Sequence, residues 1–201
     1  MLESLLHADL PTLITTVGYV GLAVIILCET GLLFGFFLPG DSLLFTAGLL
    51  ASQGVFAIWL LIPLLAAAAI VGDSMGYAIG ARIGPALYKR EDSFFFRKRY
   101  IEETEAFYAK HGPYTIVLAR FVPIVRTFAP TLAGVGRMPY TLFVRYNVLG
   151  GLLWTVGLTL AGYFLGTLVP GVADYLDAII IGIILLSLTP LLHRWWQSRR
   201  T

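Results

Sequence analysis

The sequence is poor in charge, cysteine and histidine. Charged residues make up 13% of its 201 residues and hydrophobic residues 58%, whereas soluble domains carry about 25% charged residues. The lone Cys28 excludes an intrachain disulfide and a cysteine metal cluster, and the histidines lack metal-ligand spacing. We therefore expect an integral membrane protein with one domain over residues 1–201, and no metal or cofactor.

Basic residues are also scarce, both overall and near the start of the chain. Residues 1–10 contain Glu3 and Asp9 but no lysine or arginine, so the pattern of a cleavable signal peptide is not expected there. The net charge is only +2, which is too small and too dispersed to indicate a nucleic-acid partner.

Long uncharged runs define the expected membrane segments. Residues 10–28, 42–72 and 146–173 are uncharged over 19, 31 and 28 residues, and a helix needs about 20 to cross a bilayer. The second run has a turn signal at Ser52-Gln53-Gly54. Residues 85–111 mix many basic and acidic residues with aromatic ones, which predicts an interfacial linker. A last helix is expected at about 175–195.

The basic residues predict the orientation of these segments. The linker and the C-terminus are rich in lysine and arginine, which places both in the cytoplasm of a multi-pass membrane protein. With the linker inside, residues 55–82 are expected to cross inward and residues 138–168 outward. The chain between 111 and 137 must then enter and leave on the cytoplasmic side. It is too short for two crossings, so a re-entrant hairpin broken at Pro123 is expected. Residues 10–54 begin and end outside, as either two thin spans or a re-entrant hairpin.

Two carboxylates and a Pro39-Gly40 break interrupt the first apolar region. Glu29 and Asp41 lie in a run that is otherwise uncharged from residue 10 to residue 72. A carboxylate inside a bilayer costs several kcal/mol unless it is paired, protonated or hydrated. A helix break is tolerated there only where the chain is buried in protein or lines a polar cavity. The stretch therefore predicts a functional cavity at membrane depth.

The two halves of the chain match each other. Phe37-Leu38-Pro39 corresponds to Phe121-Val122-Pro123 at an offset of 84, and Gly76–Gly80 corresponds to Gly162–Gly166 at an offset of 86. Chance similarity between glycine-rich helices is the alternative explanation. Because the expected hairpins have opposite orientations, the repeats are predicted to be inverted, as in many transporters.

The predicted fold is an all-α integral membrane protein. It has an inverted repeat of two opposed re-entrant helical hairpins, each followed by a transmembrane helix, and a C-terminal transmembrane helix. Repeat 1 spans about 10–84 and repeat 2 about 112–169. Glycines spaced by four residues in the first repeat, at 76, 80 and 84, favour close helix packing.

The halves differ in charge. Glu29, Asp41 and Asp73 lie in the first half, and Arg120 and Arg126 in the second. If the hairpin tips meet, acids face arginines in one dry cavity. The alternative is that these groups form ion pairs that only hold the halves together; breaking such a pair would cost about 3–5 kcal/mol. Asp73 is either a third acid of the site or a local partner.

These residues resemble the DedA family of bacterial inner-membrane proteins, also described as SNARE-associated or VTT-domain proteins, over about residues 10–195. The resemblance implies two opposed re-entrant hairpins, lipid translocation, required acids at Glu29 and Asp41, and required arginines at Arg120 and Arg126. The family often has Pro-Gly-Glu where this chain has Pro-Gly-Asp. The matching motifs are Phe37-x-Pro39-Gly40-Asp41, Gly72-Asp73-x-x-Gly76-Tyr77, Ala119-Arg120-Phe121-x-Pro123-x-x-Arg126-Thr127, Ala133-Gly134, Asn147, Gly150 and Trp154.

Several members of the family are linked to recycling of undecaprenyl phosphate with dependence on the proton motive force, and others to phospholipid scrambling. We therefore expect a transporter of a lipid phosphate, in which Arg120 and Arg126 hold the head group. Glu29 and Asp41 would pair with the arginines in the empty site, and protonation of one acid would free an arginine. The partners are then membrane lipids and protons.

Other functions are weighed against this one. A scramblase of phospholipids such as phosphatidylethanolamine is the first alternative, and an ion channel or osmosensing protein the second. Gly72-Asp73-Ser74-Met75-Gly76 matches the nucleophile elbow of hydrolases, but that motif needs a strand-to-helix turn, so no enzyme is expected. The sequence leaves open the exact lipid, the direction of transport and the oligomeric state, a homo-oligomer included.

Overall fold

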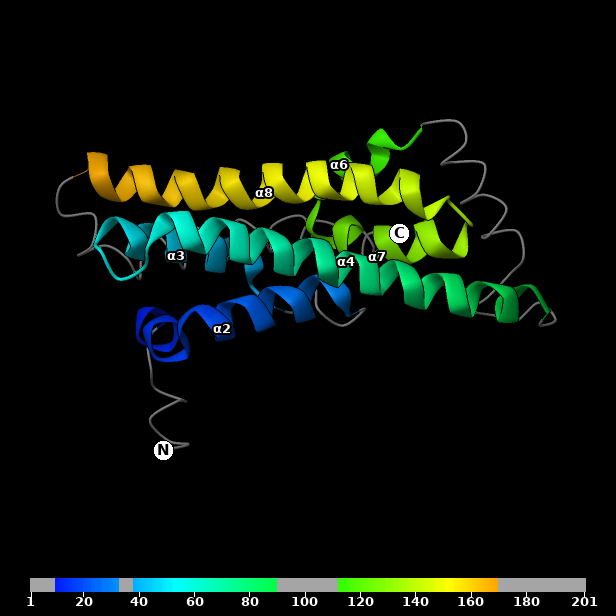
Figure 1. Ribbon diagram of the computed structural model, residues 1–201, viewed down its shortest axis with the longest axis horizontal. Coiled ribbons are helices and arrows are strands. Elements are labelled where there is room, and N and C mark those ends of the chain that lie inside the picture. Colours follow the sequence, from blue (N-terminus) through cyan, green and yellow to red (C-terminus); the bar gives the residue numbers. More distant parts are fainter. Residues whose placement is uncertain (1–9, 33–37, 90–111, 170–201) are drawn as a thin grey trace, which may run out of the picture. The chain divides into compact units, whose positions relative to one another are not determined.

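The computed structural model describes residues 10–32, 38–89 and 112–169 (Figure 1). The described part is all helical and contains no strand, which confirms the all-α prediction for these residues. The predicted C-terminal helix at 175–195 and most of the linker lie outside them. The helices are α2 (Leu10–Gly31), α3 (Gly40–Ser52), α4 (Ile58–Lys89), α6 (Tyr114–Ala119), α7 (Pro123–Val135) and α8 (Tyr140–Leu168).

Two of these helices are long and apolar enough to cross a membrane. They are Ile58–Gly84 within α4, with 27 residues, and Tyr140–Leu168, which is α8, with 29. Spans were expected at residues 55–82 and 138–168. Helix α4 continues through Pro85 to Lys89 and so ends after residue 84, where repeat 1 was expected to end. A proline removes one backbone hydrogen bond of a helix and kinks it, but need not end it.

Both prolines of the predicted breaks lie where a helix begins. Pro39 is the N-cap of α3, with Gly40 as the first helical residue. Val122 is the extended N-cap of α7, with φ −116° and ψ 106°, and Pro123 follows as the first helical residue. Proline is favoured at this position because its missing N–H would have had no partner within the helix. Helix α2 has its own kink at Gly18, where φ is 63°.

The chain forms two compact units, and α2, α4 and α8 each contribute to both. Of the described residues, 10–22, 39–61 and 158–169 belong to the first unit, and 23–32, 38, 62–89 and 112–157 to the second. In the first unit, α3 packs on the end of α8, because a Cβ atom on Gly48 or Gly162 would overlap the facing backbone. Tyr19 accepts a hydrogen bond from the N–H of Ala57 at 2.6 Å and meets the ring of Phe56 edge-on.

In the second unit, α7 packs on α4 in the same manner. A Cβ atom on Gly80 would overlap the backbone of Thr131, and one on Gly134 would overlap α4 at Tyr77. Tyr77 donates a hydrogen bond to the carbonyl of Met138. A small apolar core lies beside this contact and consists of Ile116, Ala133, Met138 and Phe143, with Tyr77 and Tyr146 packed against it.

The glycine contact therefore occurs twice along the chain. Gly48 and Gly134, and likewise Phe45 and Thr131, are 86 residues apart and make equivalent contacts in their own units. Their partners Gly162 and Gly80 on the long helices are 82 residues apart, which is about one helical turn less than the sequence match. The contact residues of α3 and α7 therefore correspond at the offset of 86 residues found in the sequence. The glycines of α8 and α4 that they meet correspond at an offset of 82 residues, which is one helical turn less.

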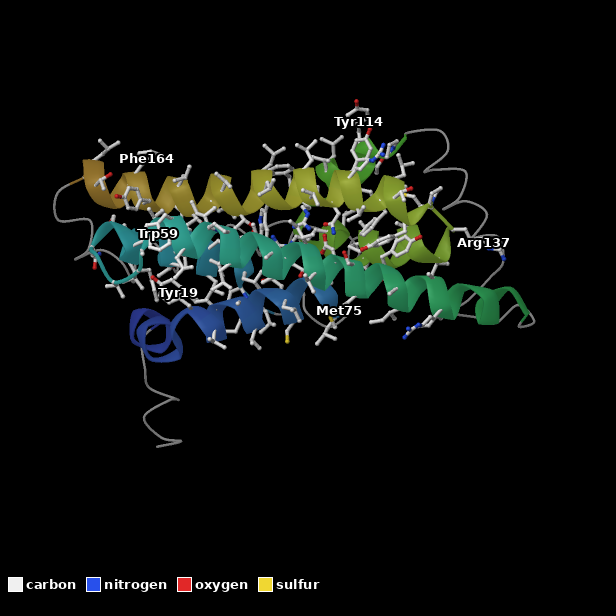
Figure 2. All side chains as sticks on the ribbon, in the orientation of Figure 1. Tyr19, Trp59, Met75, Tyr114, Arg137 and Phe164 are labelled. Atoms are coloured by element: carbon white, nitrogen blue, oxygen red, sulfur yellow. The ribbon has the colours of Figure 1, made fainter. Side chains whose placement is uncertain are left out.

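Large apolar side chains cover much of the outer surface of these helices. Figure 2 labels several of them: Trp59 is 76% exposed, Tyr114 64%, Phe164 52% and Met75 42%. Such a surface would be unusual for a monomeric soluble protein, and it fits contact with lipid chains.

We predict that Gly80→Ala destabilises the protein, because the new methyl group would overlap backbone atoms of Thr131. Backbone atoms cannot move away by a change of rotamer. Gly157→Ala is the matched control, because a Cβ atom there meets no heavy atom within 4 Å. It should be neutral or stabilising by up to about 1 kcal/mol, the helix propensity of alanine over glycine. Thermal unfolding in detergent measures both variants. Equal melting temperatures would contradict the proposed close packing.

Candidate functional site

Four charged side chains are buried together in the second unit. Glu29 from α2 is 1% exposed, Asp73 from α4 is 4%, and Arg120, directly after α6, is 4%. The side chain of Arg126, in the first turn of α7, is 11% exposed. Two acids and two arginines are therefore held in a low-dielectric interior, where each charge needs a partner.

Arg120 is fixed by two neighbours. Its Nη2 atom forms an ion pair with Oδ2 of Asp73 and donates a hydrogen bond to Oδ1 of Asn147 at 2.6 Å. Asn147 in turn donates from Nδ2 to the carbonyl oxygen of Ile70 at 3.0 Å. This chain of contacts ties the helix break before α7 to both α4 and α8.

Arg126 is paired differently. Its Nη2 atom forms an ion pair with Oε1 of Glu29, and its guanidinium carbon lies 4.8 Å from the ring centroid of Trp154. The guanidinium carbon of Arg120 lies over the same ring at 5.8 Å. Both distances are within the range of a cation–π interaction, so one buried indole faces both cations.

One face of α8 is shaped to hold the arginines. Asn147, Gly150, Gly151 and Trp154 are spaced i, i+3, i+4 and i+7, which places them on the same side of a helix. A Cβ atom on Gly150 would lie 3.1 Å from Cδ of Arg120. One on Gly151 would lie 2.9 Å from Ile70 and 3.5 Å from Nη2 of Arg120. The two glycines therefore leave the room that the Arg120 side chain occupies between its polar and aromatic neighbours.

The acids are brought in by a close contact between α2 and α4. The hydroxyl of Thr30 donates to the carbonyl of Ile26 at 3.0 Å and lies 3.4 Å from the carbonyl of Ala69. A Cβ atom on Gly31 would lie 3.0 Å from the carbonyl oxygen of Gly72. Glu29 and Asp73 are the sequence neighbours of these contact residues. The glycines thus bring the helices close enough for both carboxylates to reach the arginines.

A small cavity lies among these groups. Its volume is about 10 Å³, which is roughly the space that one water molecule needs. A group larger than a water molecule therefore cannot enter until side chains move. Among the described residues no cluster of three or more potential metal ligands occurs. The cavity is lined by Glu29, Thr30, Asp73, Arg120, Arg126, Thr127 and Trp154.

The structure brings together four of the five charged residues singled out in the sequence. Glu29, Asp73, Arg120 and Arg126 share the second unit, and Asp73, whose role the sequence left open, is the ion-pair partner of Arg120. Asp41 lies in the first unit, half-buried in the first turn of α3, and its role stays a prediction.

No role for Asn147 or Trp154 was predicted from the sequence, and Gly151 was not singled out. Their spacing with Gly150 along α8 is the signal that could have found them, since a polar residue, two glycines and a tryptophan on one face of an apolar helix suit a buried cation. That spacing does not reveal which cation the face meets, because the contact joins segments far apart in sequence.

Comparison with known proteins places the chain in a family. The VTT domain model matches residues 38–164. Protein DedA of Escherichia coli (strain K12) is 48% identical over 197 residues, covering 94% of this chain and 90% of that protein. The chain belongs to the DedA family. An uncharacterized membrane protein of Mycobacterium leprae (strain TN) is 53% identical over 178 residues, covering 89% of this chain and 79% of that protein.

A more distant DedA-family relative, the inner membrane protein YghB of Escherichia coli (strain K12), is 34% identical over 178 residues, 89% of this chain and 80% of that protein. The names of these relatives support a membrane location for the DedA-family chain. No solved structure matches it.

We predict that Asp73→Leu lowers the free energy of unfolding by about 3–5 kcal/mol, because it leaves the Arg120 charge buried without its ion partner. The double variant Asp73→Leu/Arg120→Met should recover most of that loss, since an apolar pair of similar volume removes both charges. Chemical unfolding in detergent measures the coupling. Arg82→Met, at an exposed position of α4, is the control. A double variant no more stable than Asp73→Leu would show that the pair is not energetically coupled.

Proposed function

We propose that this DedA-family chain translocates a lipid with a phosphate head group across the bacterial cytoplasmic membrane, with undecaprenyl phosphate as the substrate and proton entry as the driving reaction. The observation that supports this most directly is the pair of buried guanidinium groups, each held by a carboxylate. An arginine that is already paired with a carboxylate presents the geometry that also binds phosphate oxygens.

The charges of the site explain why protons would be needed. With both acids ionised, two carboxylates neutralise two guanidinium groups. A phosphate monoester carries about −1.5 to −2 charges at neutral pH, so its entry would leave a buried excess of negative charge. Protonation of one acid reduces that excess and releases one arginine for the head group. The proton and the lipid therefore compensate each other within the same site.

The two arginines have different parts in this proposal. Arg120 has Asn147 as a hydrogen-bond partner besides the carboxylate of Asp73. The side chain of Arg120 is 5% exposed. The side chain of Arg126 is 11% exposed and is paired with Glu29. In this proposal the guanidinium group of Arg126 exchanges Glu29 for the lipid phosphate. Arg120 stays in place and is the second hydrogen-bond donor to the phosphate. Asp41 enters the proposal as a further proton-coupling acid through the family resemblance.

The proposed membrane arrangement follows the inverted repeat. The helix boundaries at Pro39 and Pro123 would be the tips of two opposed re-entrant hairpins, with the linker and the C-terminus in the cytoplasm. The duplicated glycine contacts at an offset of 86 residues support the repeat. The site would then lie near the middle of the membrane, as in other transporters built from inverted repeats.

Scrambling of a zwitterionic phospholipid is the second candidate, and one observation favours it. The site pairs equal numbers of carboxylates and guanidinium groups, so it could also hold the phosphate and the amine of phosphatidylethanolamine.

A transporter is proposed rather than an enzyme acting on lipid phosphates, since the lining of the cavity contains neither histidine nor cysteine.

The first test is a leaflet-resolved transport assay in proteoliposomes with undecaprenyl phosphate and phosphatidylethanolamine compared side by side. We expect transport of the polyprenyl phosphate and at least a tenfold loss in Arg120→Lys, because lysine keeps the charge but cannot bond two oxygens in a fixed plane. Arg82→Lys, exposed on α4, is the matched control and should transport normally.

Equal transport of the two lipids would support the scramblase. Movement of neither lipid, with the purified protein folded, would contradict both candidates. A channel would instead show ion current across the bilayer without lipid movement.

Proton coupling is tested in the same vesicles with an imposed pH gradient. We predict that an inward proton gradient speeds transport by the wild-type protein, whereas Glu29→Gln transports at a rate that ignores the gradient, because its side chain cannot be protonated. Wild-type transport that is equally indifferent to the gradient would rule out the coupling while leaving lipid translocation intact.

A further inference from the structure

Trp154 lies where the two arginines of the site meet. Its side chain comes from the middle of α8 and is 3% exposed. The guanidinium carbons of Arg126 and Arg120 lie 4.8 and 5.8 Å from the centroid of its ring. Tryptophan has the strongest cation–π interaction of the aromatic side chains, and the interaction is stronger where water is excluded.

The indole differs from the carboxylates in one respect that matters for binding. Glu29 and Asp73 neutralise the arginines only while they are ionised and paired. The negative face of an aromatic ring is a fixed property of the ring and does not change with protonation. An arginine that leaves its carboxylate for a phosphate therefore keeps its contact with Trp154, so the ring can hold its position throughout the exchange.

The helix that carries Trp154 supports such a role. Asn147 lies two turns earlier on the same face of α8 and holds Arg120 by a hydrogen bond of 2.6 Å. Gly150 and Gly151, between Asn147 and Trp154, leave room for the Arg120 side chain. Asn147 and Trp154 are separated by about 10 Å along the helix axis, given the rise of about 1.5 Å per residue, so α8 offers the guanidinium group of Arg120 a polar contact from one end of this face and an aromatic contact from the other.

We propose that Trp154 is a positioning residue that holds the guanidinium groups of Arg120 and Arg126 side by side, ready to bind the oxygens of one phosphate monoester. The identity of the ligand rests on the proposed function. The positioning itself does not, because it follows from the contacts of the ring with both arginines. Trp154 touches the arginines and acts on the head group through them.

The first experiment needs no ligand. Tryptophans with increasing numbers of fluorine atoms, placed at position 154, weaken the negative face of the ring while nearly keeping its shape. We expect the melting temperature in detergent to fall stepwise with fluorination in the wild-type background. It should stay flat where both ion pairs are replaced by apolar pairs, in Glu29→Leu/Arg126→Met/Asp73→Leu/Arg120→Met. The same series at Trp59, which is 76% exposed, is the control and should be flat in both backgrounds. A flat series at Trp154 in the wild-type background would overturn the cation–π contact.

The second experiment measures binding of farnesyl phosphate, a short isoprenoid phosphate monoester, to the same proteins. Affinity should decrease stepwise with fluorination and be about 3- to 30-fold weaker for the most fluorinated ring, the range given by cation–π energies at partly and fully desolvated sites. Trp154→Phe should retain part of the contribution of the aromatic ring to this affinity, and Trp154→Leu should retain none of it.

The two experiments separate the possible failures. A stepwise fall in melting temperature with unchanged affinity for farnesyl phosphate would make Trp154 a purely structural residue and overturn the positioning role. If the unsubstituted protein binds no farnesyl phosphate, the proposed function fails, and the unfolding series still decides whether Trp154 holds the arginines.

Discussion

The second unit depends on the pairing of buried charges. Glu29, Asp73, Arg120 and Arg126 lie in an apolar interior, where an isolated charge would cost several kcal/mol. Each arginine is compensated by an acid from another helix: Arg120 by α4 and Arg126 by α2. Because these helices are far apart in sequence, the ion pairs also fix which segments pack together. The fold and the candidate site therefore share the same contacts.

Close packing at glycines makes this pairing tight. The contacts of Gly31 with Gly72 and of Gly80 with Thr131 bring helix backbones together, and the cavity among the charges has a volume of only about 10 Å³. In the proposed function, a head group therefore enters by replacing a partner that is already there. Arg126, with Glu29 and the Trp154 ring beside it, is better placed for such an exchange than Arg120, which also has Asn147.

The apolar spans and the helix boundaries could be predicted from the sequence because uncharged runs and prolines act locally. The cost of burying a carboxylate also marked Glu29 as a site residue, and Arg126 was marked by its place in the oppositely charged half of the chain and by the family resemblance. The partner of Arg120 could not be predicted, since Asp73 on α4 meets Arg120, which lies between α6 and α7, only through packing of segments far apart in sequence. Trp154 was visible as part of a family pattern, but its role depends on where two arginines from another segment come to lie. The offset of 82 residues between the contact glycines of α4 and α8, instead of the 86 found in the sequence, is likewise a result of packing.

The proposed transport requires that a lipid phosphate replaces Glu29 on Arg126 and that Glu29 takes up a proton when this happens. Calorimetric titration of the protein with farnesyl phosphate, in two buffers that differ in ionisation enthalpy, measures this proton directly through linkage. We expect uptake of up to about one proton per ligand bound by the wild-type protein at neutral pH, and no uptake by Glu29→Gln. Binding by the wild-type protein with the same apparent enthalpy in both buffers would contradict it.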